Sequence, residues 1–263
     1  MVLLLSMIAA WLTTNVLWLS LIFLLASAIV DAGYIAALGW IMFGFYWLEQ
    51  PYHYLSIEDY FNAMLAAVAA LFCLYLALVI IIKGKSQASS WAGYAAAICG
   101  IIYFPFAELE PLRSWLIGHT TMITASLLQA FSIPVSVEGW NILTLNGRSV
   151  EIILACTAIE SIALFTGVII SVNAPVTRKL IALVSSVLAI YILNVFRNAF
   201  VLMAYGWDWF GNDSFYVAHN IIAKFGSIIA LLTVAYLVFM LLPELLTLID
   251  ELEMEIRHPG GAA

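Results

Sequence analysis

Long apolar runs separated by short polar segments dominate the chain. Seven of these runs are long enough to cross a bilayer as a helix, which takes about 20 residues. They cover residues 4–29, 34–55, 59–82, 91–109, 150–172, 180–206 and 216–242. The runs do not alternate polar and apolar positions, as the strands of a membrane barrel do. The pattern therefore predicts an all-α polytopic integral membrane protein with about seven transmembrane helices, built as one domain over residues 1–263.

Two segments depart from this pattern. Residues 112–131 are apolar but are interrupted by glycine, histidine and several threonines, which predicts an amphipathic or re-entrant helix rather than a regular span. Residues 135–150 alternate in polarity, are rich in β-branched side chains and contain Asn146-Gly147, a strong turn signal. We expect a small β-hairpin there, outside the membrane. Two interpretations of it are open: it covers a site, or it is simply a short folded loop.

The composition agrees with a membrane protein. Hydrophobic residues make up 65% of the 263 residues, charged residues only 10%, and the mean hydropathy is +1.08, which excludes a water-soluble protein. The net charge is −7 and no long basic run occurs, so we expect no nucleic-acid partner. Cys73, Cys99 and Cys156 are few, odd in number and surrounded by apolar residues, so they form no disulfide framework.

Basic residues in the loops predict the orientation of the chain. Lys83 and Lys85 follow the third run, and Arg178 and Lys179 lie between the fifth and sixth. Basic loops stay in the cytoplasm, and both loops reach that side only if the amphipathic segment does not span the membrane. The chain is therefore expected to be a multi-pass protein of the cell membrane, with its N-terminus outside and an acidic cytoplasmic tail over residues 244–263.

The last three runs carry charged and amide side chains, which are costly in lipid and therefore mark function or paired structure. At a rise of about 1.5 Å per residue, Cys156 lies about 9 Å, Arg197 about 13 Å and His219 about 5 Å from the outer ends of their runs. All three depths fall within the outer leaflet, which predicts a catalytic core over residues 150–225. The other charged and amide side chains inside these runs are Glu160, Asn194, Asn198, Asn220 and Lys224.

Helical spacing predicts two polar faces. Cys156 and Glu160 are four residues apart and are expected to share one face. Asn194, Arg197 and Asn198 are expected to share a face of the next run, turned into the helix bundle.

The chemistry of these side chains suits acyl transfer through a thioester. A cysteine near a cation ionises readily to a nucleophilic thiolate. A histidine carries protons to the leaving group and from the incoming one, and an arginine stabilises the thiolate or an oxyanion. We therefore expect Cys156, Arg197 and His219 to be catalytic. Supporting roles fall to Glu160, Asn194, Asn198 and Asn220.

Three alternatives stay open at this point. Arg197 forms a structural ion pair with Glu160, or the two line the path of a membrane transporter, or the polar groups only join the helices of a scaffold. The lack of visible internal repeats disfavours a transporter, and a thiol contributes little to helix association. The four histidines are scattered and form no metal signature, so neither a metal nor another cofactor is expected.

Three motifs resemble those of the archaeosortase/exosortase family. Residues 151–161 resemble its cysteine motif, residues 191–198 resemble its arginine motif, and residues 217–220 fall where its third catalytic residue belongs. The resemblance extends over roughly residues 35–248. Three motifs in the right order on three runs make it specific.

The resemblance implies an intramembrane cysteine transpeptidase without a cofactor, whose active site lies near the outer face of the membrane. Such enzymes act on membrane-anchored proteins that end in a sorting signal: a short motif, a transmembrane helix and a basic cluster. They cleave near the motif and pass the new C-terminus to an amine, here implied to be that of a lipid headgroup. Surface-layer glycoproteins are the implied substrates. Whether Arg197 or His219 carries the proton is left open.

Overall fold

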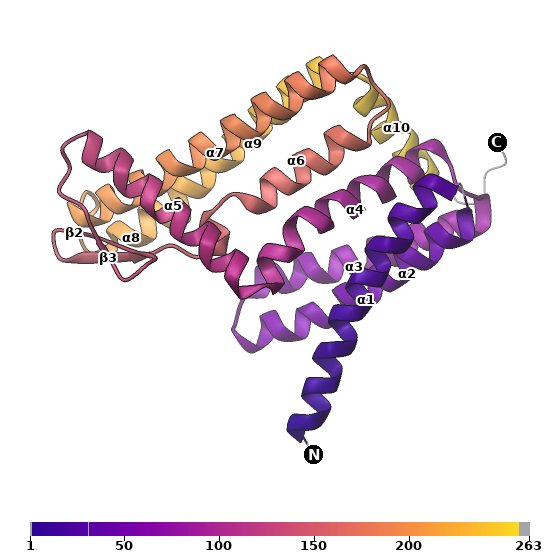
Figure 1. Ribbon diagram of the computed structural model, residues 1–263, viewed down its shortest axis with the longest axis horizontal. Helices are drawn as coiled ribbons and strands as arrows, with labels where there is room; N and C mark the ends of the chain where they lie inside the picture. Colours follow the sequence, from indigo (N-terminus) through magenta and orange to yellow (C-terminus); the bar gives the residue numbers. More distant parts are fainter. Residues whose placement is uncertain (1, 31, 258–263) are drawn as a thin grey trace. The chain divides into compact units, whose positions relative to one another are not determined.

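The computed structural model describes residues 2–30 and 32–257, with side chains from residue 15 onward. The described chain is largely helical, with a small sheet (Figure 1). The α-helices are α1 Val2–Val30, α2 Gly33–Ser56, α3 Tyr60–Lys83, α4 Gln87–Glu108, α5 Glu110–Ala130, α6 Ile159–Ser171, α7 Val176–Gly206, α8 Ser214–Tyr216, α9 Lys224–Leu241 and α10 Glu244–Arg257. The strands are β1 Ser136–Glu138, β2 Ile142–Leu145 and β3 Arg148–Glu151. Leu154–Cys156 and Gly211–Asp213 are 3₁₀ turns, and Val217–Ala223 is a π-helix.

Within the described residues, four helical stretches are long and apolar enough to cross a membrane: Tyr60–Lys83, Gln87–Glu108, Val176–Gly206 and Gly211–Leu241. Two shorter apolar helices are Asn15–Val30 and Ile159–Ser171. Lipid offers no water to backbone N–H and C=O groups, so such apolar runs fold as helices that satisfy these groups internally. The structure confirms a mostly helical, multi-pass membrane protein. The number of seven spans stays a prediction, because α2 is not among these four stretches and the described apolar parts of α1 and α6 are shorter.

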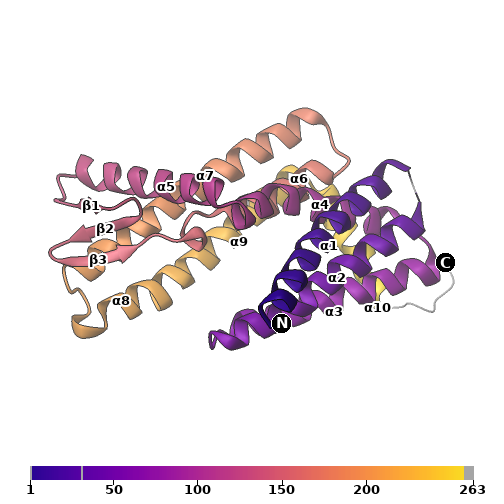
Figure 2. The ribbon, with the colours of Figure 1, turned by 60° about the horizontal axis from the view of Figure 1, so that its bottom comes forward.

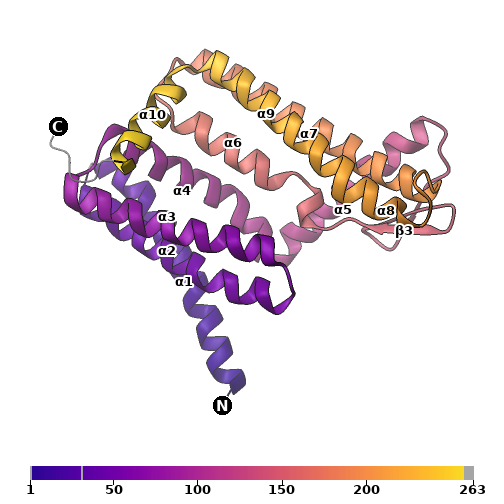
Figure 3. The same ribbon diagram turned by 180° about the vertical axis from the view of Figure 1, so that it is seen from behind.

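Contacts divide the chain into two compact units, and each is described by itself. The first unit takes in residues 1–100, 170–173 and 244–263. Within it, α1 packs against α2 and α2 against α3, as Figure 3 also shows. Helix α10 packs against α3, where the Tyr75 hydroxyl donates a 2.7 Å hydrogen bond to the carbonyl of Ile256. These contacts fix the C-terminal helix to the N-terminal helices.

Helix α10 forms the acidic tail expected after the last apolar run. Two of its own side chains, Leu245 and Leu248, are buried, and its carboxylates are interspersed with apolar side chains. This pattern is that of an amphipathic helix with one buried face. Residues 258–263 of the expected tail lie outside the described residues, and the side of the membrane on which α10 lies stays a prediction.

The second unit, residues 101–169 and 174–243, contains the sheet (Figure 2). Its three strands are antiparallel in the order β1-β2-β3. Asn146 and Gly147 join β2 to β3 with φ of 52° and 75°, the left-handed backbone that a two-residue type I′ turn requires. The hairpin predicted for residues 135–150 is therefore confirmed, and β1 adds a third strand to it.

An apolar cluster joins the sheet to α5 and α7. Leu145 of β2 packs so closely on the end of α7 that a Cβ added at Gly206 would come within 2.7 Å of its side chain. Cys156 lies partly buried against this cluster. The buried members are Ile117, Ala125, Leu128, Val135, Leu143, Leu145, Ile152, Ala199 and Leu202. The sheet is thus a fixed part of the helical unit rather than a loose external loop.

The prediction of one helix over residues 150–172 is wrong. Glu151 still belongs to β3, whose pairing with β2 keeps the chain extended, and helix α6 begins only at Ile159. Between them, Ala158 has a φ of 62°, a left-handed conformation that cannot continue an α-helix. Cys156 therefore lies in a turn before the helix, so the helical depth calculated for it does not apply.

The close approach of β2 to α7 gives a stability prediction. Gly206→Val should lower the thermal unfolding temperature by several degrees, because the new side chain must displace Leu145 and overpacking of this kind costs about 1–3 kcal/mol. Thermal unfolding of the purified protein in detergent measures this. Gly226→Val is the matched control, since a Cβ at Gly226 meets no atom within 4 Å. Equal melting temperatures of the two variants would show that the close contact of Leu145 with Gly206 does not limit the size of the side chain at position 206.

Candidate active site

Cys156 ends a tight, hydrogen-bonded turn. Its amide N–H donates to the carbonyl of Ile153 at 2.8 Å. The N–H and the hydroxyl of Thr157 both donate to the carbonyl of Leu154, at 3.0 and 2.7 Å. Ala158 then holds its left-handed conformation, which is unfavourable for a residue with a Cβ and is found mainly where surrounding contacts enforce it. The turn thus presents Cys156, half-buried, directly before the first turn of α6.

Two side-chain amides from α7 hold this turn. Asn194 and Asn198 each donate from Nδ2 to the backbone carbonyl of Cys156, at 2.6 and 2.9 Å. They lie four residues apart and so share one face of the helix, as predicted from the sequence. A carbonyl with two donors is fully satisfied without water. Helix α7 therefore fixes the position of the residue that carries the thiol.

Arg197 directly precedes Asn198 in the sequence of α7, three residues after Asn194. It is half-buried, and among the described residues no carboxylate lies within ion-pair distance of its guanidinium. The alternative of a structural ion pair with Glu160 is therefore wrong. Glu160 lies exposed in the first turn of α6, and the left-handed Ala158 breaks the helical register that would have placed it on one face with Cys156.

His219 lies in the π-helix that precedes α9. Its ring stacks on that of Phe215, with centroids 5.3 Å apart and an angle of 12° between the planes. The π-helix that carries His219 packs against α7, the helix that carries Arg197. Short π-helical segments inside α-helices occur frequently at functional sites.

The predicted residues thus fall into two groups. The structure brings Cys156, Asn194 and Asn198 into direct contact, while Arg197 and His219 lie on two helical segments that pack against each other. Glu160 and Asn220 make no hydrogen bond or ion pair with them in the described part of the chain. Within the same residues, no three His, Cys, Asp or Glu side chains are placed to hold a metal ion.

Three features of the site were not predicted from the sequence. No sequence pattern indicates the left-handed conformation of Ala158, because such a position is usually occupied by glycine or asparagine and not by alanine. No pattern indicates the π-helix at Val217–Ala223 either. The stacking of Phe215 on His219 was weakly indicated by their spacing of four residues, which places both on one face of a helix. The chain has many aromatic residues, so this spacing alone did not single out Phe215.

The chain matches a family model over most of its length. The model describes transmembrane exosortases and matches residues 1–240. This chain belongs to the archaeosortase/exosortase family. Members of the family are cysteine transpeptidases, so the chain is an enzyme of that class. The transporter and scaffold alternatives do not account for this membership.

Two relatives extend the similarity. Archaeosortase A of Natronomonas pharaonis is 27% identical over 274 aligned positions, which cover 90% of this chain and 85% of the relative. Archaeosortase A of Haloferax volcanii is 26% identical over 264 positions, covering 84% and 87%. No solved structure matches the chain. The family implies substrate proteins with a sorting signal, while the roles of individual residues in this chain stay predictions.

The asparagine contacts give a second prediction. Asn198→Leu, a change of similar shape, should lower the melting temperature, because it removes one of the two donors to the Cys156 carbonyl and a hydrogen bond contributes about 1 kcal/mol. Maleimide labelling of Cys156 should become faster as its turn loosens, measured with Cys73 and Cys99 replaced by alanine. Asn212→Leu, at an exposed position, is the matched control. Unchanged labelling and stability would contradict the holding role of Asn198.

Proposed function

We propose that this enzyme cleaves the C-terminal sorting signal of secreted surface proteins and transfers the new C-terminus to a lipid amine, through a thioester on Cys156. The observation that supports the proposal is the double hydrogen bond from Asn194 and Asn198 to the Cys156 carbonyl, because it joins the turn of the cysteine motif to the helix of the arginine motif. Family membership supplies the reaction class.

The first half of the reaction forms the thioester. The Cys156 thiolate attacks the carbonyl carbon of the scissile peptide bond, and the carbonyl oxygen becomes an oxyanion. Arg197 stabilises this negative charge, since its planar guanidinium offers several fixed donors. The oxyanion collapses, the peptide C–N bond breaks, and the leaving amine takes a proton from His219. The C-terminal helix of the substrate is released.

The second half transfers the acyl group. His219 removes a proton from the incoming lipid amine, which attacks the thioester carbon. The second oxyanion forms in the same place and again faces Arg197. When it collapses, the amide bond to the lipid forms and the Cys156 thiolate leaves, so the enzyme returns to its starting state. Glu160 and Asn220 take no step in this scheme.

The proposal includes a topology. The chain crosses the membrane seven times with its N-terminus outside, and the catalytic core 150–225 faces the outer leaflet. The substrate helix then reaches Cys156 sideways from the lipid, with its motif beside the sheet. Helix α10 lies in the cytoplasm, near the basic end of the substrate, where screened charges adjust recognition only weakly. Surface-layer glycoproteins, which end in such a signal, are the proposed substrates.

Cys156→Ala should abolish processing and leave the protein inserted in the membrane. The test is co-expression with a protein that ends in a short motif, a transmembrane helix and a basic cluster, followed by mass spectrometry for the trimmed product and for a thioester on Cys156. Cys73→Ala and Cys99→Ala are the controls and should process normally, because these thiols lie within apolar helices. A trimmed, lipid-linked product from Cys156→Ala would overturn the proposed function.

Arg197→Lys should fold normally but process about 100- to 1,000-fold more slowly, because a lysine keeps the charge and loses the planar fork that stabilises the oxyanion. Single-turnover processing by the purified enzyme measures the rate. Lys224→Arg, at the start of α9, makes the reverse exchange of the same two side chains and should keep the rate near that of the wild type. An Arg197→Lys rate equal to that of the wild type would contradict a specific role of the guanidinium.

A further inference from the structure

The ring of His219 is oriented by stacking rather than by a hydrogen bond. Phe215 lies one helical turn before His219, and the two rings are nearly parallel at 5.3 Å. This separation is within the range of offset-stacked aromatic pairs. Among the described residues, no side chain or carbonyl forms a hydrogen bond with the imidazole. The stacked ring of Phe215 therefore sets the plane in which both ring nitrogens of His219 point.

Phe215 is itself held by a chain of contacts that begins in the sheet. The Arg148 guanidinium lies 4.9 Å from the centre of the Tyr205 ring, in cation–π geometry. The Tyr205 ring meets Phe215 edge-on, with centroids 5.4 Å apart and 66° between the planes. Arg148 also forms an ion pair with Asp208, just beyond the end of α7. A continuous series of contacts thus runs from β3 to His219.

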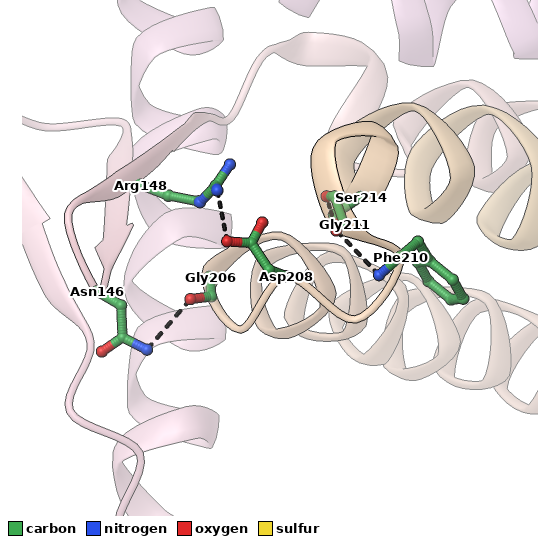
Figure 4. A network of polar contacts seen from close by, with 7 residues as sticks. All are labelled: Asn146, Arg148, Gly206, Asp208, Phe210, Gly211 and Ser214. Atoms are coloured by element: carbon green, nitrogen blue, oxygen red, sulfur yellow. Dashed lines mark hydrogen bonds and ion pairs between the residues drawn. The ribbon is translucent and has the colours of Figure 1, made fainter.

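The backbone around this series is fixed by further hydrogen bonds (Figure 4). Asn146, in the turn of the hairpin, donates to the carbonyl of Gly206 at 3.1 Å. The fully buried hydroxyl of Ser214 accepts from the N–H of Phe210 at 3.0 Å and donates to the carbonyl of Gly211 at 2.6 Å. Ser214 directly precedes Phe215. Hydrogen bonds therefore hold the loop between α7 and Phe215 at its start, at Gly206, and at its end, at Ser214.

We propose that Phe215 is a positioning residue for His219, and that Arg148 of the sheet holds Phe215 in place through Tyr205. The proposal rests on the proposed function, because it assumes that His219 carries the proton. It gives the sheet a task in the reaction: the hairpin keeps the imidazole in the orientation that proton transfer requires. Proton transfer depends steeply on this orientation, since donor and acceptor must come within hydrogen-bond distance.

A double-mutant cycle between Phe215 and His219 tests the proposal. Phe215→Leu should lower the rate of substrate processing by roughly three- to ten-fold, which corresponds to the loss of one aromatic stacking contact. Phe215→Tyr keeps the ring and should process at the wild-type rate. In a His219→Gln background, which cannot carry the proton, Phe215→Leu should cause no further loss. Non-additivity of this kind is the sign that one residue acts through the other.

Arg148→Gln tests the far end of the series and does not depend on the stability of Phe215→Leu. It should lower the rate by a few-fold, as expected for a partly exposed ionic contact, and this loss should also disappear in the His219→Gln background. Arg113→Gln is the matched control, because Arg113 forms a surface ion pair with Glu110 within α5. That variant should process normally.

A chemical readout separates this proposal from the proposed function. Diethyl pyrocarbonate should modify His219 faster in Phe215→Leu than in the wild type, as measured by peptide mass spectrometry, whether or not substrate is processed. Phe225→Leu removes an exposed ring from α9 and should leave the modification rate unchanged. Equal losses for Phe215→Leu in both backgrounds, or unchanged modification of His219, would overturn the positioning role. Processing by Cys156→Ala would instead overturn the proposed function.

Discussion

The backbone carbonyl of Cys156 accepts two hydrogen bonds from α7, and the arrangement of the site depends on them. A carbonyl that loses contact with water on folding is costly if it finds no hydrogen-bond donor. A non-helical turn at this place therefore requires partners from a neighbouring element, and Asn194 and Asn198 supply them. The same two contacts fix the cysteine turn to the helix that also carries Arg197.

The sheet has a structural importance beyond its size. Its apolar side chains pack on α5 and α7, and its turn bonds to the end of α7 at Gly206. Because β3 leads directly into the cysteine turn, the sheet fixes where that turn begins. Through Arg148, the same strand also contacts the aromatic series that ends at His219. One small element thus anchors both the nucleophile and the proposed proton carrier.

The sequence by itself determined the features that follow from local rules. Uninterrupted apolar runs form helices because lipid leaves the backbone no other way to satisfy its polar groups. The Asn146-Gly147 pair determined the hairpin turn, since both residues tolerate a positive φ. The shared face of Asn194, Arg197 and Asn198 also followed from the sequence, because helical periodicity is fixed by backbone geometry. The family motifs were recognisable for the same reason, as each is a short local pattern.

Only the tertiary structure decided how Cys156 is presented. Ala158 adopts a left-handed conformation that alanine does not favour by itself, directly after a turn held by the two amides of α7, so no local pattern in the sequence indicates the break before α6. That break removed Glu160 from the face of Cys156. The π-helix around His219 likewise has no local signal, because its hydrogen bonds differ from those of an α-helix by one residue. These conformations depend on contacts between residues far apart in the sequence, and such contacts cannot be recognised from local sequence patterns.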